Sequence, residues 1–190
     1  MSYQAHLRIA QDETADAVLE SDPFALLTGM LLDQQFPMER AFAGPAKIRE
    51  RFGTLDPAAV AAADPETFAA LCAQPPAVHR YPGSMAGRIQ TLAAHIQAEY
   101  AGETESLWSA VRSGAELFRR VQALPGFGRQ KSQIFVALLG KQLGVRPEGW
   151  EHAAGVYAEA GSFRSVADVV DAGSLERVRA FKKAQKAASR

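Results

Sequence analysis

The pentapeptide Leu124-Pro125-Gly126-Phe127-Gly128 separates two segments that have the composition of helices. Pro125 cannot continue the preceding helix, and both glycines can adopt a positive φ and carry no side chain that would hold a partner away. Leu124 can pack beneath the turn that results. The backbone N–H groups at the start of the next helix would then point outward, and the helix dipole would favour an anion there. The stretch therefore predicts a tight helical hairpin with a binding site for a phosphate group.

The charge around this turn favours a nucleic-acid partner. The whole chain has 21 Lys and Arg against 21 Asp and Glu, so any such signal must come from local clustering. From Arg112 to Arg146 the only acid is Glu116, and the basic residues are Arg112, Arg119, Arg120, Arg129, Lys131, Lys141 and Arg146. A phosphate held at a helix start positions a protein on DNA without reading bases. We therefore expect a helix-hairpin-helix over about residues 115–142, with an ordinary hairpin closed by a glycine C-cap as the alternative.

The rest of the chain is also typical of helices, because Ala, Leu, Gln, Glu and Arg dominate and period-two runs of β-branched residues are missing. A strongly apolar central helix is expected from Phe24 to Gln35. Further helices are expected at residues 12–20, 37–52, 85–100, 104–113, 115–123, 129–142 and 174–188, with shorter ones after Asp56-Pro57, Asp64-Pro65 and Trp150, and with Ser84 and Ser174 as N-caps. No linker divides the chain. Residues 1–190 are therefore predicted to form one all-α domain, either a single body or two lobes around a cleft.

Composition excludes several classes of protein. Cys72 is the only cysteine, which rules out an internal disulfide and a four-cysteine zinc or iron–sulfur site within one chain. The four histidines show no metal-ligand spacing, so no metal site is expected. The first residues do not resemble a signal peptide, and no stretch approaches about 18 uninterrupted apolar residues. We expect a cytoplasmic protein without a membrane partner.

Two blocks of the chain resemble a known family. Residues 26–35, Leu-Leu-Thr-Gly-Met-Leu-Leu-Asp-Gln-Gln, are similar to the family's apolar helix that ends in a polar, glutamine-containing turn, and residues 124–131, Leu-Pro-Gly-Phe-Gly-Arg-Gln-Lys, are similar to its hairpin. The distance between the blocks is also similar. The chain from about Phe24 to Glu148 thus resembles the HhH-GPD superfamily of base excision repair DNA glycosylases, to which endonuclease III and 3-methyladenine glycosylase belong. The resemblance implies a two-lobed helical fold, here without the iron–sulfur cluster of many endonuclease III relatives.

The resemblance also implies how DNA would be bound. Such enzymes bend the duplex and flip the target base into a cleft between the lobes. It places Gln35 near the DNA as a wedge that fills the gap left by the base. Further DNA contacts are expected from Gly126, Gly128, Arg129, Gln130, Lys131, Arg80 and Ser84, and Tyr81 and Trp150 are expected to line the base pocket. The hairpin is expected to hold a monovalent cation through backbone carbonyls, as family members can.

The chemistry that the resemblance implies depends on two positions. Bifunctional members use a lysine amine that forms a Schiff base with the sugar, and Gln130 occupies that position here. Lys131 lies about 100° further around the helix and is expected to point elsewhere. A monofunctional glycosylase, in which water attacks the sugar, is therefore implied. Gapless counting from the lysine position to the family's catalytic aspartate reaches Glu148, and Glu151 and Asp33 are the alternative carboxylates.

These observations leave three hypotheses for the function. The first is a monomeric, monofunctional DNA glycosylase that removes a damaged or mispaired base from double-stranded DNA in the nucleoid. The second is a non-catalytic protein that kept the scaffold and recognises distorted or damaged duplex. The third is a helical protein–protein module in which the hairpin is incidental, and it predicts no salt-dependent affinity for DNA.

Overall fold

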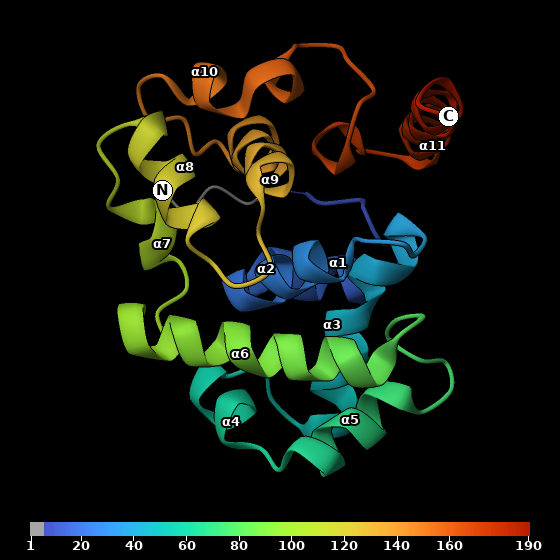
Figure 1. Cartoon of the computed structure of the whole chain (residues 1–190), viewed down its shortest axis with the longest axis vertical. Helices are drawn as coiled ribbons and strands as arrows, with labels where there is room; N and C mark the ends of the chain where they lie inside the picture. Colours follow the sequence, from blue (N-terminus) through green and yellow to red (C-terminus); the bar gives the residue numbers. More distant parts are fainter. Residues whose placement is uncertain (1–5) are drawn as a thin grey trace.

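The computed structural model describes residues 6–190, which form eleven α-helices and two short 3-10 helices and contain no strand (Figure 1). The predicted all-α class is therefore confirmed. Residues 1–5 lie outside the described residues. The expectation that the chain does not start with a signal peptide concerns this segment. Among the helices described, none has the length and apolar character needed to cross a membrane.

Helix α2 (Pro23–Leu32) lies at the centre of the molecule. Asp22 caps its start by accepting hydrogen bonds from the backbone N–H groups of Phe24 (2.9 Å) and Ala25 (3.3 Å). Every residue from Phe24 to Leu32 is buried, as expected of a helix that is apolar on all sides. Helices α1 (Glu13–Ser21) and α3 (Met38–Phe52) pack against it.

Two groups of helices lie on opposite sides of α2 (Figure 1). The first consists of α4 (Pro57–Ala62), α5 (Pro65–Ala73) and α6 (Pro82–Tyr100). The second consists of α7 (Ser106–Ser109), α8 (Gly114–Gln122), α9 (Arg129–Gln142), α10 (Trp150–Ala154), the 3-10 helices η1 (Gly155–Ala158) and η2 (Val166–Asp168), and α11 (Ala172–Ala188). One cluster of buried apolar residues extends through both groups, from Leu7 to Val178. The hairpin between α8 and α9 therefore stands on the same core as α2.

The strongest local signals located helices correctly. The helix predicted at residues 129–142 is α9, with the same limits. Both Asp-Pro pairs open helices, because Asp56 and Asp64 accept a hydrogen bond from a backbone N–H in the first turn while the proline supplies a helical φ.

Other helix limits were predicted wrongly. The central helix ends at Leu32 rather than at Gln35, because the backbone of Asp33 leaves the helical region (φ −76°, ψ 69°). The helix expected over residues 104–113 is reduced to the four residues of α7. In both places the predicted helix continues past the residue at which the helical backbone ends.

The two predicted serine caps were also wrong. Helix α6 already begins at Pro82, whose ring fixes a helical φ, so Ser84 lies inside its first turn. Helix α11 is capped by Asp171, whose carboxylate accepts a hydrogen bond from the backbone N–H of Ser174 (2.6 Å). The earlier proline or aspartate determined the helix start in both cases.

Candidate functional site

The turn between α8 and α9 has the backbone that its sequence predicts at Gly126. This glycine has φ +85°, in the left-handed region, and a Cβ added to it would lie 2.7 Å from the Leu31 side chain. Leu124 and Phe127 on either side are 2% and 5% exposed, so the turn is held by its apolar residues against the core. Gly126 is therefore required both by its conformation and by the close approach of α2.

Gly128 has a different role. Its backbone is extended (φ −79°, ψ −176°), so it does not use the positive φ that glycine permits. A Cβ added at Gly128 would meet nothing within 4 Å, and no side chain caps the start of α9. The first backbone N–H groups of α9 consequently have no partner within the helix and lie beside open space. This arrangement suits a phosphate oxygen, which the helix dipole would also attract.

The basic run around the hairpin is only partly available to a ligand. Arg112, Arg119 and Arg129 are exposed. Lys141 pairs instead with Asp168 (2.6 Å) and Arg120 with Glu116 (2.8 Å). Arg146 donates to a carbonyl at the end of α9. About half of the predicted basic footprint therefore stabilises the fold.

Lys131 lies where the sequence did not predict it. Its amine reaches the end of α2 and donates to the backbone carbonyls of Met30 (2.7 Å), Leu31 (3.3 Å) and Asp33 (3.3 Å). Burial lowers the pKa of Lys131 to about 8, although the nearby Asp33 carboxylate acts to raise it. These contacts differ from the DNA contact expected of Lys131, because a lysine side chain is long enough to reach a helix end that offers unpaired carbonyls.

Asp33 is the buried carboxylate of this region. Its side chain is 8% exposed, and one carboxylate oxygen lies 3.9 Å from the Lys182 amine on α11. Burial raises the pKa of Asp33, while the charges of Lys182 and Lys131 act to lower it. The end of α2, the start of α9 and the middle of α11 thus bring one carboxylate and two amines together. This pattern of opposed burial and charge effects is common at catalytic sites.

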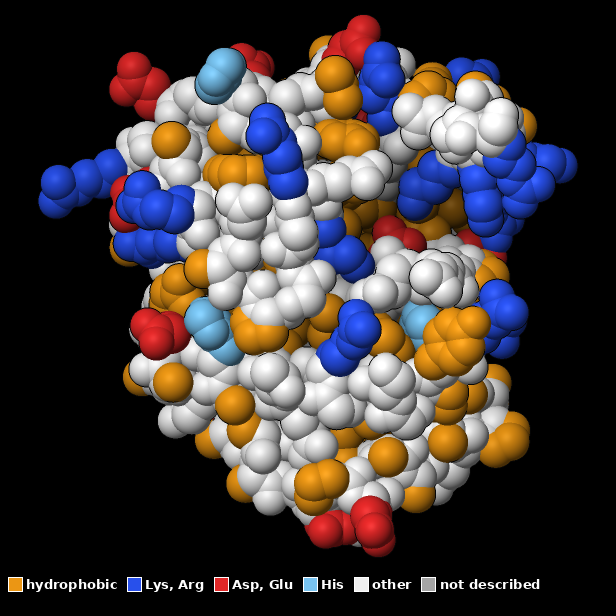
Figure 2. Space-filling view, in the orientation of Figure 1, with side chains coloured by type: hydrophobic (Ala, Val, Ile, Leu, Met, Phe, Trp, Pro, Cys, Tyr) orange, Lys and Arg blue, Asp and Glu red, His pale blue; other side chains and the backbone are white. Residues whose placement is uncertain are grey.

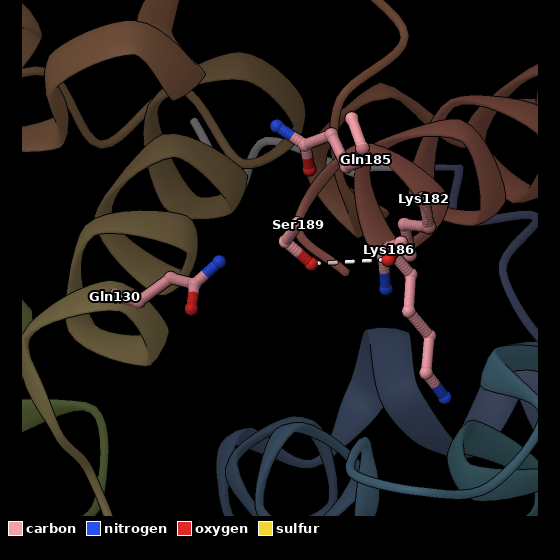
Figure 3. A pocket seen from close by; sticks show the side chains of 6 residues that line it. Gln130, Lys182, Gln185, Lys186 and Ser189 are labelled. Carbon is pink, nitrogen blue, oxygen red and sulfur yellow. Dashed lines mark hydrogen bonds between the residues drawn. The ribbon is translucent and has the colours of Figure 1, made fainter.

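A groove adjoins this cluster and shares Lys182 with it. It has a volume of about 700 Å³ and is lined by Gln130, Lys182, Gln185, Lys186, Ala188 and Ser189. Figure 3 shows Gln130 on α9 facing the α11 side chains across open space. In Figure 2 the hollow beside α11 has Lys and Arg side chains along its rim and acidic side chains deeper inside. Gln130, predicted as a DNA contact, therefore lies in the groove wall, where its amide also donates to the Tyr157 hydroxyl (3.0 Å).

The structure places Glu148, the first candidate for catalysis, in another location. The residue is exposed, and its backbone carbonyl accepts a hydrogen bond from the Gly114 N–H (2.8 Å). Its surroundings form a separate cavity of about 360 Å³, lined by Ser113, Ala115, Phe118, Arg129, Gln133, Glu148, Gly149, His152 and Ala153. Glu151, the second candidate, is exposed on α10. Neither glutamate lines the groove that adjoins the Asp33 cluster.

Trp150 and Tyr81, predicted to line one base pocket, are not brought together. The Trp150 ring packs so closely on α9 that a Cβ at Gly140 would lie 2.4 Å from it, and the Arg146 guanidinium lies 5.7 Å from its centre. Trp150 therefore holds α10 against α9. Tyr81 precedes α6, is 48% exposed and carries the Arg80 guanidinium 5.4 Å from its ring centre.

A histidine connects the loop of Tyr81 with that of Gln35. The His79 ring donates from Nε2 to the Gln34 carbonyl (2.8 Å) and accepts at Nδ1 from the Tyr81 N–H (3.0 Å), an arrangement that requires the neutral ring. Burial lowers the pKa of His79, which agrees with this form. Gln35 itself is exposed and has φ +52°, a conformation rare for a residue with a side chain. His79 therefore joins the two loops, and the exposed side-chain amide of Gln35 belongs to a residue whose backbone conformation is strained.

Sequence reasoning undervalued Lys182, Asp33 and Lys131. Lys182 belongs to a basic helix whose charges look like a solvated face in the sequence. A row of cations at helical spacing, Arg179, Lys182 and Lys186, was the available signal, but only the packing of α11 shows which carboxylate it faces.

Comparison with known proteins gives one match. The family model described as HhH-GPD superfamily base excision DNA repair protein matches residues 28–190. No curated protein and no solved structure matches the chain. The match extends from α2 through the hairpin to α11, and so includes every residue of the Asp33 cluster and the groove.

Proposed function

The chain belongs to the HhH-GPD superfamily of base excision DNA repair proteins, and from this premise we propose that it is a monofunctional DNA glycosylase. It would hydrolyse the N-glycosidic bond of a damaged or mispaired base in duplex DNA. The single observation that carries the proposal is the Asp33 cluster, because it sets a buried carboxylate beside an open groove next to the hairpin.

The hairpin would hold the DNA backbone. Backbone N–H groups at the start of α9 offer hydrogen bonds to a phosphate, and the absence of a side chain at Gly128 leaves room for it. Arg129 is exposed beside this point and adds charge. These contacts carry no sequence information, which suits an enzyme that must examine any stretch of duplex.

Asp33 is proposed as the catalytic carboxylate in place of Glu148. Its carboxylate would accept a proton from the water whose oxygen bonds to C1′, while the C1′–N bond breaks and its electron pair leaves with the base. The same negative charge would stabilise the cationic character that the sugar develops. Burial strengthens both effects because water screens the charge less. The neighbouring Lys131 and Lys182 help to keep Asp33 ionised.

Lyase activity is not expected. Gln130 has no amine, and the Lys131 amine donates to three backbone carbonyls at the end of α2. Attack on the sugar would require Lys131 to lose these hydrogen bonds and leave carbonyls of α2 without a partner. Its position supports a structural role, in which it joins α9 to α2 and charges the surroundings of Asp33.

The surface formed by Gln35 and Tyr81 would support the distorted duplex. Both side chains are exposed and lie on loops that His79 connects. A planar amide and an aromatic ring can each stack on bases that lose a neighbour when a nucleotide is flipped out. Arg80 stacks on Tyr81 and brings a positive charge to the same surface.

We also propose that the turn holds the monovalent cation that the family resemblance implies. Among residues 6–190, no backbone N–H outside the helices donates to the carbonyls of Gln122, Ala123 and Pro125, and these oxygens would be its ligands. Carbonyl oxygens are suitable ligands for such an ion. A cation held there would supply further positive charge beside the DNA phosphate.

A base-release assay tests the proposal. Duplexes carrying uracil, hypoxanthine, ethenoadenine, an alkylated purine or 8-oxoguanine are incubated with the protein, and half of each sample is then treated with hot alkali. The proposal predicts cleavage of at least one duplex only after alkali, because base loss without lyase action leaves an intact abasic strand. Cleavage without alkali would contradict the monofunctional assignment, and no cleavage of any duplex would favour a non-catalytic protein.

The non-catalytic alternative has one observation in its favour. The position where the resemblance places the family's aspartate holds Glu148, which is exposed and lies outside the groove. A protein without catalysis would still bind duplex DNA through the hairpin, and its affinity would still depend on salt. Salt-dependent binding without base release from the panel would support this second function.

A further inference from the structure

Helix α11 carries a row of basic side chains, and those nearer its C-terminal end have fewer or weaker ion pairs with acidic residues. Arg179, Lys182 and Lys186 are separated by three and four positions and therefore share one face. Arg179 is anchored by ion pairs with Glu39 and Glu176. Lys182 is 3.9 Å from Asp33, a loose contact. Lys186 makes no ion pair with any of residues 6–190, so its charge is available to a ligand.

The groove into which this row points is suited to an anion. Lys182 and Lys186 line it from α11, together with Gln185 and Ser189, and Gln130 lines it from α9 (Figure 3). None of the residues that line the groove is acidic, and the buried Asp33 carboxylate lies 3.9 Å from Lys182, which does line it. Amines, amides and a hydroxyl can together satisfy the oxygens of a phosphodiester.

The position of the groove indicates which anion it would take. It is bounded on one side by the start of α9, where the hairpin would bind the DNA backbone, and on the other by α11. A backbone that enters it would pass Lys182, whose amine lies 3.9 Å from the Asp33 carboxylate. The rise between Lys182 and Lys186 is about 6 Å along the helix, so the two amines can reach one phosphate together or two neighbouring phosphates.

We propose that α11 forms a second wall of the DNA site, in which Lys182 and Lys186 bind backbone phosphate next to the extruded nucleotide. This proposal rests on the proposed function and adds a DNA contact that the hairpin does not supply. The duplex strand would be held on two sides of the groove, by the amides of α9 and by the amines of α11. The C-terminal helix would then be part of the binding site rather than a solvated surface.

The dependence of DNA affinity on salt tests this proposal. Binding of a fluorescent duplex with a stable abasic-site analogue is measured between 50 and 200 mM KCl, a range over which about 10³-fold changes occur when many phosphates are contacted. Lys186→Gln removes one groove amine. Lys183→Gln is the matched control, because Lys183 is exposed on the same helix but does not line the groove. Gly128→Leu, at the hairpin, reports on the proposed function separately.

The expected result is that Lys186→Gln reduces the slope of log affinity against log salt by about 0.9, while Lys183→Gln leaves it nearly unchanged. Equal effects of the two substitutions, or no effect of either, would contradict the proposal that α11 binds the DNA backbone. If Gly128→Leu weakens binding while Lys186→Gln does not, the hairpin assignment survives and only the role of α11 fails. Absence of salt-dependent duplex binding by the unaltered protein would overturn both. Circular dichroism spectra of all variants verify that each is folded.

Discussion

At the scale of single residues, burial gives Asp33 and Lys131 properties that their sequence positions do not indicate. Both are removed from water at the end of α2, and burial moves the pKa of the carboxyl upward and that of the amine downward. Each charge partly compensates for the burial of the other. A buried pair of this kind contributes little to stability by itself, because desolvation offsets the attraction. Its presence beside a groove is better explained by function.

The pH dependence of base release should reveal the carboxylate. The ionised form of Asp33 is proposed as the active one, so activity is lost as the pH falls through its pKa. Because burial raises this pKa, the acidic limb should lie at higher pH than an exposed aspartate would give. The charge of Lys182 lowers the same pKa, so Lys182→Gln should move the limb further upward, whereas Lys183→Gln should not. A limb that Lys182→Gln leaves in place would contradict the assignment.

The two glycines of the hairpin should respond differently to the same substitution. Gly126→Ser places a side chain at φ +85° and against Leu31, and should lower the free energy of unfolding by about 1–3 kcal/mol. Gly128→Ser meets open space, and its hydroxyl can cap α9, so stability should stay level or increase. Urea denaturation of both variants measures the difference. Equal losses of stability would show that Gly128 is also constrained by the fold.

Gln35 should be replaceable for folding but not for function. Its φ of +52° is disfavoured for a residue with a side chain and natural for glycine. Gln35→Gly should therefore leave stability unchanged or raise it by about 1 kcal/mol, while weakening binding to a duplex with an abasic-site analogue. A variant that is less stable would indicate that the Gln35 side chain supports the fold instead. Thermal denaturation and a binding titration on the same preparation separate these outcomes.

At the scale of elements, the hairpin was predictable and the arrangement around it was not. The limits of α9 and the left-handed Gly126 follow from local rules, because proline and glycine act on their own backbone. The caps of α6 and α11 were misplaced because a serine competes with a nearby proline or aspartate. The contacts of Lys131 and Lys182 join segments about a hundred or more positions apart. Such contacts depend on packing, which no local pattern contains.

The hairpin should lose its DNA contact when its open space is filled. Gly128→Leu directs a large side chain to the point where a phosphate would approach, and duplex affinity should fall about tenfold or more. Ala58→Leu is the matched control, because Ala58 is exposed on α4 in the other group of helices. A titration by fluorescence anisotropy compares the two variants. Equal affinities would place the DNA contact somewhere other than the hairpin.

At the scale of the whole molecule, α9 and α11 of the second group of helices line one groove, and Lys182 of that groove lies beside the end of the central helix α2 (Figure 1). The chain has no net charge, so attraction to DNA depends on where its cations are concentrated. Several basic residues predicted to face DNA are used within the fold, whereas α11 carries cations into the groove. Composition indicated the class of fold. It did not indicate which of three carboxylates is buried beside a lysine of the groove, because that depends on how α2, α9 and α11 come together.

The central claim is that Asp33, at the meeting point of these elements, performs the chemistry. The most direct test is single-turnover base release by the unaltered protein, by Asp33→Asn and by Glu148→Gln, with duplex binding measured on the same samples. The expected result is that Asp33→Asn still binds DNA but releases the base about 10²–10⁴ times more slowly, while Glu148→Gln remains close to the unaltered protein. Loss of base release in Glu148→Gln with activity retained in Asp33→Asn would contradict the account and place the chemistry in the other cavity.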